Sequence, residues 1–230
     1  MIGDARWRWM RRWKKAAETA HRAASGSALA DYYAAGPPDM DVPWQSAPLI
    51  AIDLETDGLD ARSDMLLEAG WVALSNGAVR LATAQRLRIS AQSDLRASSV
   101  VIHGITDDAA QKGSSEADML AALLPLLGGA VIVAHNAVIE QAFLDAACRR
   151  VFGAPLLLPA ICTMDIEMRW FPRERTHDGL RLGTLRARHG LPAYHAHDGL
   201  VDAMASGELL LAQIAAARRD RVSLAELIRW

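Results

Sequence analysis

An apolar run that ends in two closely spaced carboxylates constrains this chain more than any other feature. Residues 49–54 read Leu-Ile-Ala-Ile-Asp-Leu, which is typical of a short buried strand. Positions two apart on a strand face the same side, so Asp53 and Glu55 project together from its end. Two neighbouring carboxylates repel each other unless a cation lies between them, and their hard oxygen donors suit Mg²⁺ or Mn²⁺. The run also fits an ordinary acidic turn closed by Asp57 and Gly58.

The segments after this run predict a mixed sheet flanked by helices. Consecutive strands followed by helices that alternate with a further strand are typical of that α/β arrangement. An Asn-Gly pair at residues 76–77 predicts a hairpin between the second and third strands. The expected strands are 49–54, 65–74, 79–89 and 130–134, and the expected helices are 115–127, 137–150, 163–170, 180–189 and 198–217.

The N-terminal segment differs in charge from the rest of the chain. Residues 1–22 carry a net charge of +5, whereas the whole chain carries −2. Tryptophans and alanines recur there at helical spacing with arginines and lysines on the other side, which predicts an amphipathic helix. The Gly-Pro-Pro sequence at 36–38 then indicates a linker. We therefore divide the chain into an N-terminal helix and linker (1–47), a main domain (48–217) and a tail or short helix (218–230).

Three interpretations of the N-terminal helix stay open at this point. Its tryptophans, Trp9 and Trp13, can pack against the chain's own domain or against a second copy in a homodimer. Its basic side can bind nucleic acid or a protein partner. Basic residues opposite tryptophans also describe a helix that lies on a membrane surface.

The cysteines and the hydropathy pattern predict a soluble cytoplasmic protein. Cys148 and Cys162 occur singly in apolar surroundings without C-x-x-C spacing, which favours reduced core thiols. Charged residues interrupt the N-terminal segment, so it has no export signal core. No stretch approaches the roughly 20 apolar residues that cross a bilayer.

Two further motifs carry acids beside histidines. In the first, His135 and Asn136 follow a buried strand, and Glu140 lies in the opening turns of the next helix. This pattern also fits a capped helix whose acid complements the helix dipole. In the second, His197 precedes Asp202 by five residues, in a loop that leads into a helix. That spacing lets Asp202 point into a site while His197 overhangs it.

The ordered set of these motifs resembles the DEDDh exonucleases. This DnaQ-like family includes the bacterial DNA polymerase III epsilon-type proofreading subunits and ribonuclease T. The resemblance spans about residues 48–217 and includes His103-Gly104-Ile105-Thr106, which is similar to a His-Gly-Ile-Thr segment of the family. It implies a ribonuclease H-like fold with a mixed five-stranded sheet and an N-terminal helical extension.

The resemblance also implies an activity and a role for each motif. The activity is metal-dependent 3′→5′ exonucleolysis that releases nucleoside 5′-monophosphates from single-stranded DNA or RNA ends. Two divalent ions, Mg²⁺ or Mn²⁺, act with a histidine general base. The implied metal ligands are Asp53, Glu55, Asp202 and Glu140, the last at a position where the family usually has aspartate; the implied base is His197, and the implied substrate contacts are Thr56 and His103.

Other functions remain compatible with the sequence. One is a nucleic-acid-binding module of the same fold whose catalysis is weakened at Glu140. Another is an exonuclease that acts as a subunit of a polymerase or repair complex. A group of arginines that flank Asp178 and Gly179 can hold phosphates or form a solvated surface, and the two aromatic residues beside them can stack on bases or pack internally. These residues are Arg169, Arg173, Arg175, Arg181, Trp170 and Phe171.

Overall fold

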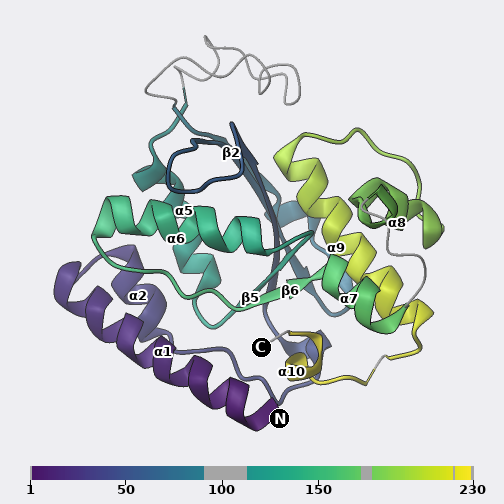
Figure 1. The fold of residues 1–230 in the computed structure, drawn as a ribbon, viewed down its shortest axis with the longest axis horizontal. Coiled ribbons are helices and arrows are strands. Elements are labelled where there is room, and N and C mark those ends of the chain that lie inside the picture. Colours follow the sequence, from purple (N-terminus) through teal and green to yellow (C-terminus); the bar gives the residue numbers. More distant parts are fainter. Residues whose placement is uncertain (1, 91–112, 172–177, 220, 229–230) are drawn as a thin grey trace.

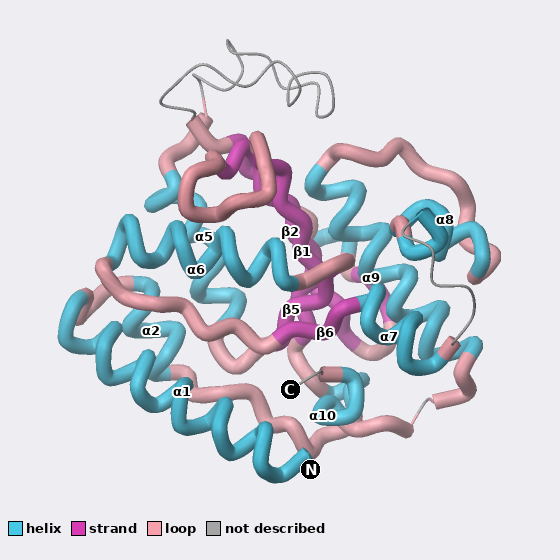
Figure 2. The backbone as a smooth tube through the Cα atoms, in the orientation of Figure 1, coloured by secondary structure: helices cyan, strands magenta, loops and turns pink. Residues whose placement is uncertain are grey.

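A computed structural model describes residues 2–90, 113–171, 178–219 and 221–228, and it contains one sheet between two groups of helices (Figure 1). The strands form one layer with helices on either side (Figure 2). The sheet order is β3-β2-β1-β5-β6, with β4 also paired to β2. β1 runs antiparallel to β2 and parallel to β5, which confirms the predicted mixed sheet. The strands are β1 (Leu49–Thr56), β2 (Leu66–Ser75), β3 (Ala78–Val79), β4 (Gln85–Arg88), β5 (Val131–Ala134) and β6 (Ala160–Cys162).

The single strand predicted at 79–89 is wrong, because a short 3-10 helix (Leu81–Thr83) divides it into β3 and β4. Both pieces pair with β2 and occupy one position in the sheet. Local bonds keep the interruption stable: the Thr83 hydroxyl accepts from the Ala73 backbone N–H at 2.9 Å, and the Arg80 N–H donates to the Ala73 carbonyl at 2.9 Å. The sheet therefore has the five strand positions that the family resemblance implies.

The alternating residues of β1 divide between two hydrophobic clusters, one on each face of the sheet. Ile50 and Ile52 belong to the cluster shared with α1, α2, α5 and α6. Leu49 and Ala51 belong to the cluster shared with α7, α9 and α10. The helices are α1 (Ile2–Ala23), α2 (Ala28–Ala34), α5 (Glu116–Leu127), α6 (Val138–Phe152), α7 (Thr163–Trp170), α8 (Leu182–Arg188), α9 (Gly199–Ala216) and α10 (Leu224–Leu227).

Helix α9 is the central helix of one of these faces. It is the one helix in the described part of the chain that is long and apolar enough to cross a membrane by length and composition. Leu209, Leu210 and Ile214 on this helix are nonetheless buried inside the protein. Its apolar character is thus that of a core helix packed on β1 and β2.

Helix α1 packs on its own domain. Trp13 is 4% exposed, and its ring lies 5.2 Å from that of Tyr32 and 5.0 Å from that of Tyr33. The two tyrosine hydroxyls donate to the carbonyls of Leu157 and Pro155 at 2.8 and 2.9 Å. Their helix, α2, lies in the segment interpreted as linker, because seven residues carry too little periodicity to indicate a helix. The division at residue 47 stays a prediction.

The chain's last described segment pairs with the segment that leads into β1. Ser223 and Glu226 form a capping box at α10, and Leu224 and Leu227 are buried. Backbone N–H groups of Leu224 and Ala225 donate to carbonyls of residues 42 and 40 at 3.0 and 2.9 Å. Of the tail or short helix expected at residues 218–230, the structure has a short helix, α10, and its buried leucines belong to the second cluster.

Candidate active site

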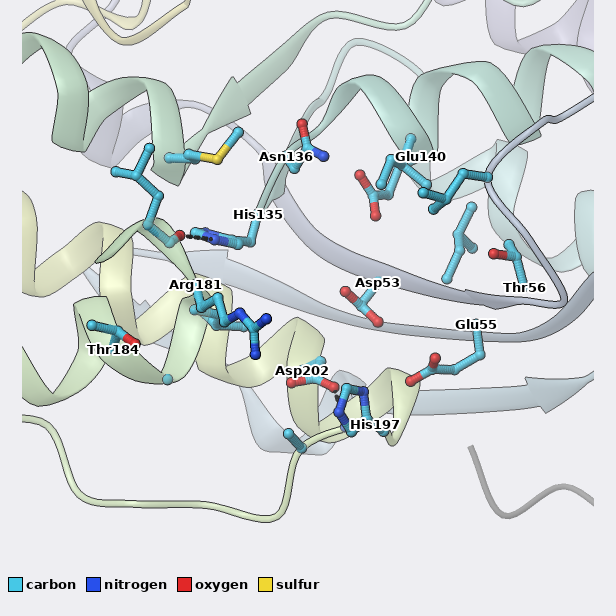
Figure 3. Close-up of a pocket in the computed structure, with 18 of the residues that line it drawn as sticks. Asp53, Glu55, Thr56, His135, Asn136, Glu140, Arg181, Thr184, His197 and Asp202 are labelled. Carbon is cyan, nitrogen blue, oxygen red and sulfur yellow. Dashed lines mark hydrogen bonds between the residues drawn. The ribbon is translucent and has the colours of Figure 1, made fainter. Parts of the chain in front are cut away.

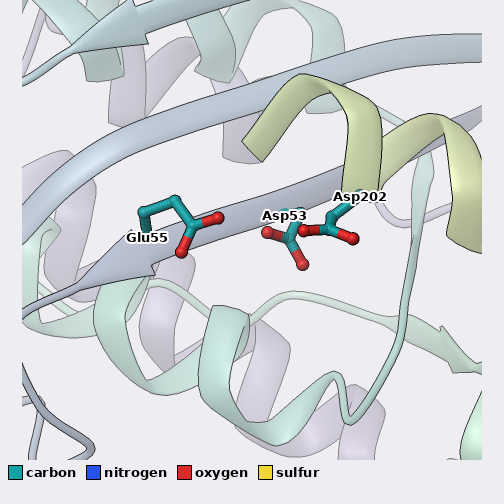
Figure 4. Close-up of side chains that lie close together, drawn as sticks. All are labelled: Asp53, Glu55 and Asp202. Atoms are coloured by element: carbon teal, nitrogen blue, oxygen red, sulfur yellow. The ribbon is translucent and has the colours of Figure 1, made fainter. Parts of the chain in front are cut away.

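Three carboxylates from two elements meet beside β1. Asp53 and Glu55 lie on β1, two residues apart, and Asp202 lies in the first turn of α9 (Figure 4). Each offers one oxygen, and these oxygens all lie within 4.8 Å of one another. Asp57 does not join them, because its carboxylate accepts the Met65 backbone N–H at 2.6 Å and holds the turn after β1.

A glycine lets α9 approach the sheet closely enough to deliver Asp202. Gly70 of β2 lies directly opposite Asp53 in the β1–β2 ladder. A Cβ atom at Gly70 would lie 2.1 Å from the backbone nitrogen of Leu200, which no structure tolerates without a backbone shift. Gly199 is also tightly placed, since its Cβ would lie 3.2 Å from the Gly70 nitrogen. The small residues on both sides therefore set the distance between Asp53 and Asp202.

Glu68 holds the beginning of α9 in this position, and the sequence interpretation missed it. It lies opposite Glu55 in the ladder and is 3% exposed. One carboxylate oxygen accepts the Gly199 N–H at 3.1 Å, and the other pairs with the Arg88 guanidinium at 3.3 Å. A carboxylate also suits the positive end of the helix dipole. The signal that could have revealed it is a lone acid inside an apolar strand, where an acid needs a partner.

The loop before α9 brings His197 over the same site. The backbone N–H of His197 donates to an Asp202 carboxylate oxygen at 2.7 Å. His197 adopts a left-handed backbone with φ of 69°, which turns the chain sharply into the helix. Asp198 then caps α9 by accepting the Val201 N–H at 3.1 Å. His197 is exposed and lines the pocket with the three acids (Figure 3).

Glu140 comes to the pocket from α6, on the other side of the sheet. It is 3% exposed, and its Oε2 atom has no hydrogen-bond partner among the described residues. Burial raises the pKa of Glu140 to about 8. Glu140 lines the same pocket but is not one of the three acids whose oxygens gather within 4.8 Å.

The gathered charges disfavour ionisation of one another. Burial raises the pKa of Asp53 well above its usual range, and the charges of Glu140, Asp202 and Glu55 raise it further. Burial also raises the pKa of Asp202, against hydrogen bonds from the Tyr194 hydroxyl and the His197 backbone N–H that lower it. A divalent cation among these oxygens would remove the repulsion, so the donor set fits Mg²⁺ or Mn²⁺.

The remaining predicted residues have varied places. Thr56 lines the pocket, and its hydroxyl donates to the Gly58 carbonyl at 2.6 Å. Arg169 contacts the C-terminal segment instead of the pocket, through the carbonyls of Glu226 and Leu227 at 3.0 and 2.8 Å. Trp170 packs against the second cluster, which favours its structural interpretation. The ring of Phe171 lies 5.0 Å from that of a histidine in an internal contact. His103, Arg173 and Arg175 lie outside the described residues.

The acid cluster at the end of a mixed sheet is typical of metal-dependent nucleases, and comparison with known proteins agrees. The family model described as RNase_T, exonuclease, matches residues 50–210. The chain belongs to this exonuclease family, which confirms the resemblance found in the motifs.

Curated relatives and solved structures are consistent with that membership. The chain is 29% identical over 167 residues to a PolC-type DNA polymerase III of Lacticaseibacillus paracasei, covering 73% of this chain and 11% of the relative. It is 26% identical over 163 residues to that of Bacillus subtilis, covering 70% and 11%. The chain therefore spans about a tenth of these polymerases.

Two solved structures share the fold. A zinc-bound complex of E. coli exonuclease I with single-stranded DNA superposes with a TM-score of 0.67 at 18% identity, covering 76% of this chain and 42% of that one. Exonuclease X in complex with 5′-overhanging duplex DNA gives 0.61 at 21% identity, covering 78% and 98%.

Proposed function

We propose that this protein hydrolyses the terminal phosphodiester bond at nucleic-acid 3′ ends and releases nucleoside 5′-monophosphates. The observation that carries the proposal is the meeting of Asp53, Glu55 and Asp202 beneath His197, inside a chain of the exonuclease family. Both structural neighbours described above hold DNA, one single-stranded and one duplex with an overhang.

Asp53, Glu55 and Asp202 would hold the divalent cations, and Glu140, which lies outside this group of three, would act on them through water. When bound, two such ions polarise the attacking water and stabilise the leaving 3′-oxygen. The residues themselves set the geometry: the β1 backbone fixes Asp53 and Glu55, and the Gly70 contact fixes Asp202. Little rearrangement is then needed when substrate arrives, and this preorganisation is where such sites gain most of their rate.

His197 would accept the proton of the attacking water. Imidazole is the side-chain base whose protonation changes near neutral pH, which suits a general base at that pH. The backbone of His197 is tied to Asp202, so the base and a metal ligand keep a fixed relation. The ring itself lies on the exposed side, where a strand can reach it.

Thr56 and two apolar residues of the same pocket would bind the terminal nucleoside. Leu59 and Ile139 line the same pocket as Thr56, and Leu59 is 80% exposed. An exposed leucine beside a polar pocket offers an apolar surface against which a base can pack and bury area. His103 is proposed as a second contact of this nucleotide.

The relatives carry the matching segment within a DNA polymerase III, so a polymerase or repair complex is the partner that we propose. In that setting the exonuclease would act on the 3′ end of a strand under synthesis. Co-purification of this chain with replication or repair proteins would support the proposal. A chain that is recovered from its own cells without any such protein would contradict it, whether or not the chain trims ends by itself.

The test uses 5′-labelled single-stranded DNA and RNA with Mg²⁺, with Mn²⁺ and with EDTA. We expect a ladder that shortens from the 3′ end, depends on the metal and is absent with Asp53→Ala. The faster substrate identifies the sugar that the pocket accepts. Tight binding without any ladder would contradict the proposal and favour the binding-module function.

A further inference from the structure

His135 is a motif residue that the proposed chemistry does not use, and it joins two parts of the pocket wall. Its Nδ1 lies 2.8 Å from the Thr163 hydroxyl, and its Nε2 lies 2.8 Å from the Leu180 carbonyl. A carbonyl only accepts, so Nε2 carries the proton. Because both ring nitrogens form hydrogen bonds, the His135 side chain links the end of β5 to the segment before α8. We call this link a strut.

Arg181 follows Leu180 directly, and α8 anchors it from the other side. Leu185 of α8 is fully buried. The Arg186 guanidinium donates to the Ala205 carbonyl of α9 at 2.9 Å. The backbone at residue 181 therefore has fixed neighbours before and after it, while the Arg181 side chain is exposed and lines the pocket.

Arg181 is the only arginine or lysine among the described residues that line this pocket, whose other charged members are acids. Phosphates approaching those acids meet repulsion. A guanidinium offsets it, and its planar fork matches two phosphate oxygens. Asp53, Glu55 and Asp202 provide the place for cations at the scissile phosphate, so the phosphate that fits the Arg181 guanidinium is a different one.

The pocket places Arg181 and Thr56 on opposite sides of Asp53 (Figure 3). In the proposed reaction, the terminal nucleoside lies beside Thr56 and the scissile phosphate lies beside the acids. The strand that stays attached then leaves past Arg181. We propose that Arg181 binds the phosphate one nucleotide before the scissile bond, and so grips the retained strand. This inference rests on the proposed function.

Two dinucleotides isolate that phosphate. TpT contains only the scissile phosphate, whereas pTpT adds a 5′-phosphate at the proposed Arg181 position; uridine dinucleotides replace them if RNA is the better substrate. We expect the native protein to favour pTpT over TpT by about tenfold or more in kcat/KM. In Arg181→Gln this preference should fall to about one, because kcat/KM falls much more on pTpT than on TpT. Arg181→Lys should keep part of the preference, because it keeps a point charge.

Arg22→Gln, an exposed arginine near the end of α1, is the matched control and should keep the full preference. On longer single strands, Arg181→Gln should reduce the slope of log affinity against log salt by about 0.7, the value for one phosphate contact. A preserved pTpT preference in Arg181→Gln, or an equal loss on TpT and pTpT, would overturn the inference. If Arg181→Gln still hydrolyses TpT, the proposed function stands even when one of these two results overturns the inference about Arg181. Native protein that forms no 3′ ladder would instead overturn the proposed function.

Discussion

The two faces of the sheet supply acids to the site in different ways. On the face covered by α9, Leu49, Ala51, Asp53 and Glu55 follow one another at every second position of β1. The same backbone alternation that builds a hydrophobic cluster thus ends in a pair of acids. On the opposite face, Glu140 reaches the pocket from α6, whose N-cap has no side-chain hydrogen bond.

The acids of the two faces therefore differ in what determines their position. For the acids of the α9 face it is the backbone, and for Glu140 it is the conformation of a long side chain. The β1–β2 ladder and the Gly70 contact fix the backbones of Asp53, Glu55 and Asp202 relative to one another. Glu140 can move by rotation about its own side-chain bonds, and its Oε2 atom has no partner among the described residues. We infer that the α9 face sets whether the site binds metal and that Glu140 tunes how well it works.

The largest expected effect comes from the acids of the α9 face. Asp53→Asn or Asp202→Asn should lower kcat/KM roughly 10³-fold or more, because each removes charge from the metal site. Both variants should fold, since the change relieves repulsion in the metal-free protein. Turnover of 5′-labelled strands and thermal unfolding in EDTA measure the two effects. Activity within tenfold of native in these variants would contradict the inference that the acids of the α9 face determine metal binding.

Removal of the proposed base comes next. His197→Ala should lower kcat by about 10²–10⁴-fold and leave strand affinity nearly unchanged, because the ring acts in the transition state. His195→Ala is the control, since His195 is exposed two residues away and does not line the pocket. Single-turnover rates at saturating protein measure this. A larger loss in His195→Ala would move the base to that residue.

Glu140 should give a smaller and graded effect. Glu140→Gln should lower kcat/KM about 10–100-fold, the range for a group that supports a metal indirectly. Glu140→Asp should change it by less than about tenfold, because a group acting at a distance tolerates a shorter side chain. Steady-state rates across a Mg²⁺ titration test both variants. Losses equal to those of Asp53→Asn would place Glu140 among the direct ligands.

The smallest expected effect is on stability. Burial raises the pKa of Glu140 to about 8, so the folded metal-free protein keeps a proton there that the unfolded chain releases near pH 4.5. The unfolded state binds fewer protons in this window, and stability therefore falls as pH rises from about 4.5 to about 8.

Thermal midpoints in EDTA should drop by several degrees across that window, less in Glu140→Gln. Excess Mg²⁺ should remove much of the drop, because the metal stabilises the ionised acids of the folded state. The measurement is differential scanning calorimetry at matched ionic strength. A midpoint that rises over this window in EDTA would contradict a raised pKa of Glu140 in the folded protein.

The sequence predicted the parts of the fold and site that depend on local pattern. The β1 acids, the helix that carries Asp202 and the alternation of strands and helices follow from periodicity and spacing. β6 was missed because three residues after a Leu-Pro run show no alternation. Helix α2 was missed because its stability comes from Tyr32 and Tyr33 reaching carbonyls more than 120 residues away.

The residues that organise the site depend on long-range contacts that no local pattern records. Gly70 matters because α9 crosses it, and Glu68 matters because it caps that helix. Tyr194 contributes a hydrogen bond that lowers the pKa of Asp202; it lies just before the motif of His197 and Asp202, but no spacing in that motif marks it as a partner of the acid. His135 appeared as a motif residue, but its function as a strut required the position of Leu180.

The most direct test of the comparison between the two faces is a crystal structure with Mn²⁺, using anomalous scattering to place the ions. The account predicts an ion bound directly by oxygens of Asp53, Glu55 or Asp202 at about 2.1 Å, with Glu140 linked to it through water. Direct ligation by Glu140 with Asp202 outside the coordination shell would contradict the account. So would the absence of any ion at these three acids in protein that trims 3′ ends.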